Sequence, residues 1–155
     1  MTYLVDTNVL LRIIQVNHSM HADAIRAAAT LGDQGHELFV TGQNLIEFWA
    51  VATRPESSNG PALSVANTVA HIETFKQTFS VLPDTPEIFP AGERLAQAHA
   101  VNGRQSHDAR LVAAMLVHGV TRILTFNTAD FQRYQEITAI APDEVLQSTI
   151  KGSPP

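Results

Sequence analysis

The sequence predicts a three-layer α/β/α domain with a mainly parallel central sheet, and two observations support this class. Short apolar runs suited to buried strands alternate with longer stretches of helical periodicity along the chain. Hydrophobic residues make up 45% of the 155 residues and charged residues only 16%, a composition that favours a packed core over disorder. At this length we expect one domain over residues 1–150, with 151–155 as a flexible tail.

The first half of the chain predicts two strands, Thr2–Asp6 and Glu37–Val40, because both are short runs with a mainly apolar core. Three stretches between and after them have helical patterns: Val9–Val16, His18–Gly32 and Gly42–Thr53. The last of these ends before Pro55, because the residue that precedes a proline disfavours helix. A turn-rich loop, Arg54–Pro61, follows.

The second half begins with a helix at Ser64–Phe79, where apolar residues recur at helical spacing. Val81–Pro90 is predicted as a loop because Pro83 and Pro86 interrupt it. The remaining predicted elements are helices at about Ala91–Val101 and at Asp108–His118, each ending near a glycine, and strands at Thr121–Phe126 and Ile137–Ala141. Strands therefore alternate with helices, as parallel sheets require.

Charge and composition narrow the possible functions and the compartment. The chain has 10 basic and 15 acidic residues, a net charge of −5, which argues against a protein that grips nucleic acid by charge alone. It contains no cysteine, so disulfides and thiolate metal sites are excluded. Neither a membrane-spanning run nor a signal peptide is evident. We therefore expect a cytoplasmic protein with no membrane partner.

Four acidic residues lie in unusual places. Asp6, Asp108 and Asp130 lie at predicted strand ends or helix starts, and Glu47 lies in a predicted helix that is apolar on nearly every side. Because the carboxyl ends of parallel strands share one edge of the sheet, the four can converge there. Oxygen-only ligands of this kind suit Mg²⁺ or Mn²⁺ rather than zinc. Four carboxylates at such close range repel one another, and a cation relieves that repulsion.

Each acidic residue also has an ordinary structural explanation. Asp6 and Asp108 are common helix N-caps, Asp130 is an ordinary turn residue, and Glu47 can be half of a buried ion pair. Other catalytic constellations fail: Ser106-His107-Asp108 are consecutive and cannot form a hydrolase triad. The glycine-rich loops that cradle nucleotide phosphates are absent from the sequence.

Taken in order, these segments resemble those of the PIN-domain ribonucleases, most closely the VapC-type toxins of bacterial toxin–antitoxin pairs. Asp6, Glu47 and Asp108 match the three acidic positions that the family shares, and Asp130 matches a more variable fourth. Asn127 stands where some relatives carry another acidic residue. The matching stretches are Val5-Asp6-Thr7-Asn8-Val9-Leu10, the helix with Glu47, Arg104-Gln-Ser-His-Asp108-Ala-Arg110-Leu-Val and Leu124-Thr-Phe-Asn127-Thr-Ala-Asp130-Phe131.

The resemblance implies a PIN-like fold and a Mg²⁺-dependent endoribonuclease, with Mn²⁺ as a possible substitute. Its substrate would be RNA, a cognate antitoxin would inhibit it, and it would form a homodimer, for which the apolar helices Leu45–Ala52 and Val65–Phe79 offer surfaces. The alternative is a non-catalytic PIN-like module that binds RNA or protein. Retention of all four acidic positions favours the enzyme, because a retired site has no physical reason to keep four repelling charges.

Phosphodiester hydrolysis assigns a role to each of these residues. Asp6 and Asp108 are expected to be the most direct metal ligands, and Glu47 a ligand or a residue that holds water. Asp130 is expected to bind a second ion or to accept a hydrogen bond from bound water. The residues expected to orient the carboxylates or to contact the substrate are Thr7, Asn8, Asn127, Arg104 and Arg110.

Overall fold

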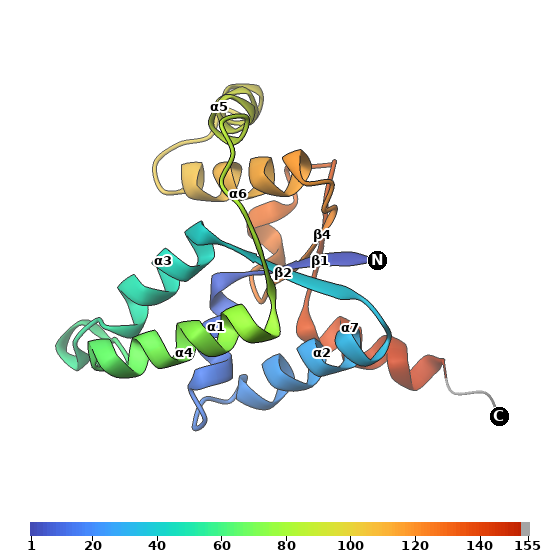
Figure 1. Ribbon diagram of the computed structural model, residues 1–155. Helices are drawn as coiled ribbons and strands as arrows, with labels where there is room; N and C mark the ends of the chain where they lie inside the picture. The colour runs from blue at the N-terminus through green and yellow to red at the C-terminus, as the bar shows by residue number, and fades with distance from the viewer. Residues whose placement is uncertain (153–155) are drawn as a thin grey trace.

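A five-stranded, all-parallel sheet forms the middle layer of the molecule (Figure 1). The structure is a computed structural model and describes residues 1–152. The strands are β1 (Thr2–Val5), β2 (Glu37–Thr41), β3 (Ser80–Leu82), β4 (Arg122–Leu124) and β5 (Thr138–Ile140). They lie in the order β3-β2-β1-β4-β5. The predicted α/β class with a parallel sheet is therefore confirmed.

Helices cover both faces of the sheet. The helices are α1 (Thr7–Ile14), α2 (His21–Asp33), α3 (Gly42–Ala52), α4 (Val65–Thr78), α5 (Ile88–Ala98), α6 (Gln105–Val117) and α7 (Pro142–Lys151), with short 3₁₀ turns η1 (Glu56–Ser58) and η2 (Thr128–Phe131). Figure 1 shows α5 and α6 on one side of the sheet and α1, α2, α4 and α7 on the other. None of the helices in residues 1–152 is long and apolar enough to cross a membrane.

The side chains of the central strands alternate between the two faces of the sheet and so divide the core into two halves. Successive side chains of a strand point to opposite faces, so Leu4 packs with α6 whereas Val5 packs with α1, α2 and α3. On β4, Ile123 and Leu124 divide in the same way. All four side chains are completely buried. Such strands, apolar on both faces, are what a sheet covered by helices on each side requires.

The order of the strands fixes where a ligand site can form. From β1 the chain builds β2 and β3 on one side, and later β4 and β5 on the other. The direction of winding reverses between β1 and β4, and open parallel sheets bind ligands in the crevice at the carboxyl ends of such strands. Val5 pairs with Leu124, and the backbone N–H of Asp6 donates to the carbonyl of Leu124 at 3.0 Å.

The predicted loop at Val81–Pro90 is wrong at both ends. Ser80–Leu82 is the edge strand β3, which is too short to produce a periodic signal. Helix α5 begins at Ile88, so that Pro90 lies in its first turn, where a missing N–H leaves no intrahelical hydrogen bond unmade.

The C-terminal end differs from its prediction as well. Helix α7 was not predicted; it begins at Pro142 and runs through Lys151. Ala141 and Glu144 close its first turn, since the Glu144 side chain accepts from the Ala141 N–H at 2.7 Å. The predicted tail therefore loses residue 151 to this helix, and its residues 153–155 lie outside the described part of the chain.

Replacing Phe48 by Ala should lower the free energy of unfolding by about 3–5 kcal/mol. Phe48 is completely buried on α3 and meets Phe75 of α4 edge-on at 5.0 Å between ring centroids, so truncation leaves a cavity. Urea denaturation measures the change. Phe89→Ala is the matched control: Phe89 is 71% exposed, so its loss should change stability by less than about 0.5 kcal/mol. Equal effects of the two changes would contradict this account of the core.

Candidate active site

Asp6 is a carboxylate held at the buried end of β1. Its side chain is only 8% exposed. It caps α1, where one carboxylate oxygen accepts the backbone N–H of Thr7 at 2.8 Å. The other oxygen accepts from the Thr125 hydroxyl at 2.8 Å and from the Asn8 amide at 3.2 Å. The Asp6 side chain therefore both caps α1 and belongs to the candidate site.

Thr125 joins the end of β4 to the start of α1. Its hydroxyl donates to Asp6 and accepts from the Asn8 amide at 3.1 Å and from the Asn127 N–H at 3.0 Å. The side-chain amide oxygen of Asn8 in turn accepts a hydrogen bond from the backbone N–H of Phe126 at 3.1 Å. These bonds hold the segment after β4 against the segment after β1. Asn8 therefore contacts both Asp6 and the segment after β4, and so does Thr125, which was not predicted.

Glu47 is held from two sides. Helix α3 begins after Thr41, which forms a reciprocal capping box with Asn44, and this places Glu47 in the second turn. One oxygen of Glu47 accepts from the Gln43 amide and the other from the Thr7 hydroxyl, both at 2.9 Å. Glu47 is half-buried rather than enclosed by apolar groups, because α3 leaves part of its surface exposed. The helix was expected to be apolar on nearly every side, with Glu47 buried in it; Glu47 is instead only half-buried.

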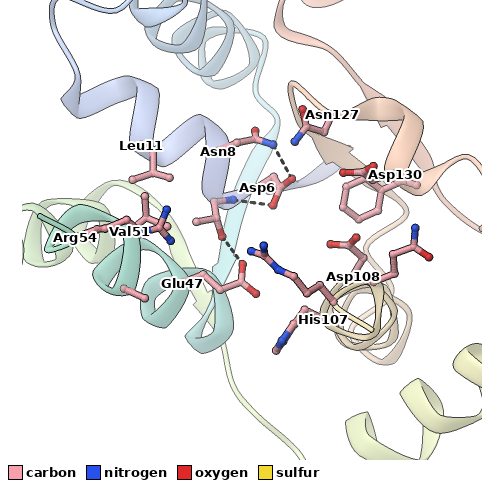
Figure 2. Close-up of a pocket in the computed structure, with 15 residues that line it drawn as sticks. Asp6, Asn8, Leu11, Glu47, Val51, Arg54, His107, Asp108, Asn127 and Asp130 are labelled. Atoms are coloured by element: carbon pink, nitrogen blue, oxygen red, sulfur yellow. Dashed lines mark hydrogen bonds between the residues drawn. The ribbon is translucent and has the colours of Figure 1, made fainter. Parts of the chain in front are cut away.

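Asp108 and Asp130 come from the opposite side of the pocket. Helix α6 begins at Gln105, so Asp108 lies in its first turn and does not cap it. Asp130 lies on η2, after β4, and is exposed. Figure 2 shows Glu47 on one side, Asp108 and Asp130 on the other, and Asp6 between them. All four carboxylates line one pocket of about 560 Å³.

The carboxylates influence one another through their charges. The pKa of Asp6 is raised from its ordinary 3.8 to about 6, mainly by burial and also by the charges of Glu47 and Asp108, against hydrogen bonds from Thr125 and Thr7 that lower it. The pKa of Asp108 is likewise raised to about 6, mainly by burial and then by the charges of Asp130 and Glu47. A cation in the pocket would favour the ionised form of both groups.

The donor set fits a hard divalent cation such as Mg²⁺. The acidic lining offers only oxygen ligands, and Mg²⁺ commonly binds through one or two carboxylates while keeping several waters. Within residues 1–152, however, no three His, Asp or Glu side chains are grouped closely enough to hold one ion as they stand. The hydrogen bonds that Asp6 and Glu47 accept fix both carboxylates in their present positions.

Arginine side chains surround the acidic pocket unevenly. Arg104 lines it, and so does Arg54, which follows α3 and was not predicted. Arg110 is not among the lining residues; its guanidinium donates to Gln43 and Asp84. Asn127, Thr7 and Asn8 all line the pocket. Gln43 lies four residues before Glu47 on the same helix face, so their contact could have been predicted from the sequence spacing.

Residues 3–137 match the family model of the PIN domain. The chain belongs to the PIN domain family. The family match covers the strand and helix segments that carry all four carboxylates. No curated protein matches the chain.

This PIN domain is similar in fold to toxin–antitoxin proteins of known structure. VapBC-1 from nontypeable Haemophilus influenzae superposes with a TM-score of 0.69 at 16% identity, covering 92% of this chain and 99% of that one. VapBC2 from Rickettsia felis, solved bound to a promoter DNA fragment, gives 0.68 at 12% identity, with coverages of 91% and 98%. VapC20 from Mycobacterium tuberculosis, described as a sarcin–ricin loop cleaving toxin, gives 0.58 at 16%, with 78% and 86% covered.

The stability of this PIN domain in a chelating buffer should fall as pH rises from about 4 to about 6. A raised pKa means that folded Asp6 holds its proton more tightly than unfolded Asp6, so ionisation in this window favours unfolding. For Asp6 the shift from 3.8 to about 6 corresponds to about 3 kcal/mol. Asp108 acts in the same direction. Urea denaturation between pH 4 and 7.5 should show a flatter curve for Asp6→Asn than for wild type; identical slopes would contradict this.

Proposed function

We propose that this PIN domain is a Mg²⁺-dependent endoribonuclease that acts as the toxin of a toxin–antitoxin pair. The observation that carries the proposal is the sharing of one pocket by Asp6, Glu47, Asp108 and Asp130, at the point where the sheet reverses its winding. The rise in the pKa of two of these groups adds support, because perturbed acids gather at functional sites. Membership of the PIN domain family supports the nuclease part.

The residues of the chain divide the work of phosphodiester hydrolysis. Asp6 and Asp108 would hold Mg²⁺, and Asp130 would hold a second ion or accept a hydrogen bond from water. When bound, the ion lowers the pKa of water and offsets charge on the phosphate oxygens. Glu47, with each oxygen already accepting one hydrogen bond, can accept a further one from the attacking water. Mn²⁺ would substitute for Mg²⁺, since both prefer oxygen ligands.

RNA would be held by local positive charge despite the net charge of −5. Arg54 and Arg104 line the pocket at exposed positions, and the charge of Arg133 lowers the pKa of Asp108. Guanidinium groups suit phosphate because their planar donors can form paired hydrogen bonds. These arginines would position the RNA backbone, while the acidic residues act at the scissile phosphate.

A cognate antitoxin is the proposed inhibitor. Several proteins of similar fold were solved as toxin–antitoxin complexes. An antitoxin segment that placed an Arg or Lys among the four carboxylates would pair with them and compete with the cation. The acidic pocket, open to solvent on the side of Asp130, offers such a segment a complementary charge.

Purified protein should cleave a structured RNA in the presence of Mg²⁺ or Mn²⁺ and not in EDTA. Asp6→Asn and Asp108→Asn should each lower the rate by more than about 100-fold, since even a partner of a metal ligand is worth about 10–100-fold. Cleavage is measured by gel electrophoresis of end-labelled RNA. Asp143→Asn is the control, because Asp143 lies on α7, outside the pocket, and its loss removes the same charge.

The same experiment separates the enzyme from a non-catalytic binding module. Equal RNA binding by wild type and both pocket variants, with no cleavage by any of them, would establish the binding module and overturn the nuclease. Cleavage that persists in both pocket variants would show that the acidic pocket is not the catalytic site.

A homodimer is proposed through the exposed apolar side chains of α3 and α4. Ile46 is 72% exposed and Val65 is 60% exposed, and the two helices are in contact. Ile46→Glu should convert a dimer to a monomer, because a charge replaces an apolar contact. Light scattering after size exclusion measures the mass. Ile150→Glu, at an exposed position of α7, is the control; a monomeric wild type would refute the dimer.

A further inference from the structure

The side-chain amide of Gln43 connects two segments that carry the acidic site. Its nitrogen donates to Glu47 at 2.9 Å and to the backbone carbonyl of His107 at 2.8 Å. His107 precedes Asp108 in the first turn of α6. One amide group therefore contacts the Glu47 carboxylate on α3 and the peptide next to Asp108 on α6. Gln43 is itself buried.

Arg110 determines which way this amide faces. The carbonyl oxygen of Gln43 accepts from a guanidinium nitrogen of Arg110 at 2.9 Å. A guanidinium can only donate, so the opposite orientation of the amide would place its NH₂ group against donors and its oxygen against the Glu47 carboxylate. The other terminal nitrogen of Arg110 pairs with Asp84 at 3.1 Å, which holds the guanidinium in place. Asp84 also lies against Gly42, where an added Cβ would be 3.3 Å from its carboxylate.

We propose that Gln43, oriented by Arg110, is a positioning residue that fixes the Glu47 carboxylate and keeps α3 in register with the start of α6. The inference rests on the proposed metal-dependent nuclease. With both amide hydrogens donated and the oxygen accepting, Gln43 has one low-energy orientation. Arg110 acts through Gln43 and not by contact with substrate, because it does not line the pocket and each of its terminal nitrogens donates away from it, to Gln43 and Asp84.

If Arg110 had a purely structural role, its loss would lower the stability of the protein and its metal binding together. Its ion pair with Asp84 is well exposed, with 38% and 57% of the two side chains accessible. Exposed pairs contribute little to stability. Loss of this pair alone, as in Asp84→Asn, should therefore change the melting temperature of the metal-free protein by less than about 4 °C. An effect on metal binding without a matching loss of stability identifies positioning.

Calorimetric titration with Mn²⁺ gives the first readout. Gln43→Met and Arg110→Met should each weaken Mn²⁺ binding by about 10-fold or more, as loss of a group that orients a ligand does. Arg94→Met is the charge-matched control, since Arg94 lies on α5 away from the acidic pocket, and it should bind Mn²⁺ like wild type. Wild-type affinity in Arg110→Met would overturn the inference.

The double variant tests whether Arg110 acts through Gln43. In a Gln43→Met background, Arg110→Met should cause no further loss of Mn²⁺ affinity, because the group it orients is already gone. An additional loss equal to that of the single variant would show that Arg110 acts independently and would overturn the proposed route. An effect confined to the KM for RNA would instead indicate direct phosphate contact.

A metal-free measurement separates this inference from the proposed function. In wild type the NH₂ protons of Gln43 should exchange slowly with solvent by NMR, and Arg110→Met should raise their exchange rate by about 10-fold or more while Arg94→Met leaves it unchanged. Unchanged exchange in Arg110→Met overturns the positioning role even if Mn²⁺ binds. A wild type that neither binds Mn²⁺ nor cleaves RNA, yet shows the expected exchange, overturns the nuclease and leaves the Arg110–Gln43 contact established.

Discussion

The burial of one carboxylate governs the architecture around it. Asp6 ends the central strand with little access to water, and every hydrogen bond it accepts comes from a neighbouring segment that must therefore be in place. Thr7 and Asn8 belong to the helix that begins there, whereas Thr125 belongs to the end of β4, more than a hundred residues later. Three donors offset part of the cost of desolvation but not all of it, and the remaining cost is what a cation would relieve.

The second half of the pocket is organised by neutral side chains. In residues 1–152, the hydrogen bonds that Glu47 accepts come from Thr7 and Gln43 and from no basic residue. A direct arginine or lysine partner would neutralise the carboxylate and weaken its attraction for a metal ion. Arg110 contacts Gln43 and not Glu47. It therefore orients the Gln43 amide without itself pairing with the Glu47 carboxylate. The arrangement keeps the pocket negative in a way that an ion pair would not.

The acidic residues could be predicted from the sequence more readily than the residues that hydrogen-bond to them. Asp6 was identifiable because an apolar strand stops at it, and that signal is local. Thr125 and the contact of Gln43 with His107 join segments far apart in the chain, which periodicity does not report; only the spacing of Gln43 from Glu47 is a local signal. The fold class followed from alternating strands and helices, yet β3 was missed since three residues at a sheet edge carry little pattern. Two prolines lie in the first turns of helices: Pro90 in α5, inside the stretch predicted as a loop, and Pro142 in α7, which was not predicted.

The position of β4 beside β1 has a consequence for the newly made chain. During synthesis, residues emerge in order from the N-terminus, and β1 must wait for Arg122–Leu124 before it gains its second neighbour. Until then Asp6 lacks the Thr125 hydroxyl and the pocket lacks its wall at Asp130. A chain that stops before residue 125 therefore lacks both the hydroxyl that supports Asp6 and the side of the pocket at Asp130, so the pocket is complete only after both halves of the sheet have been made.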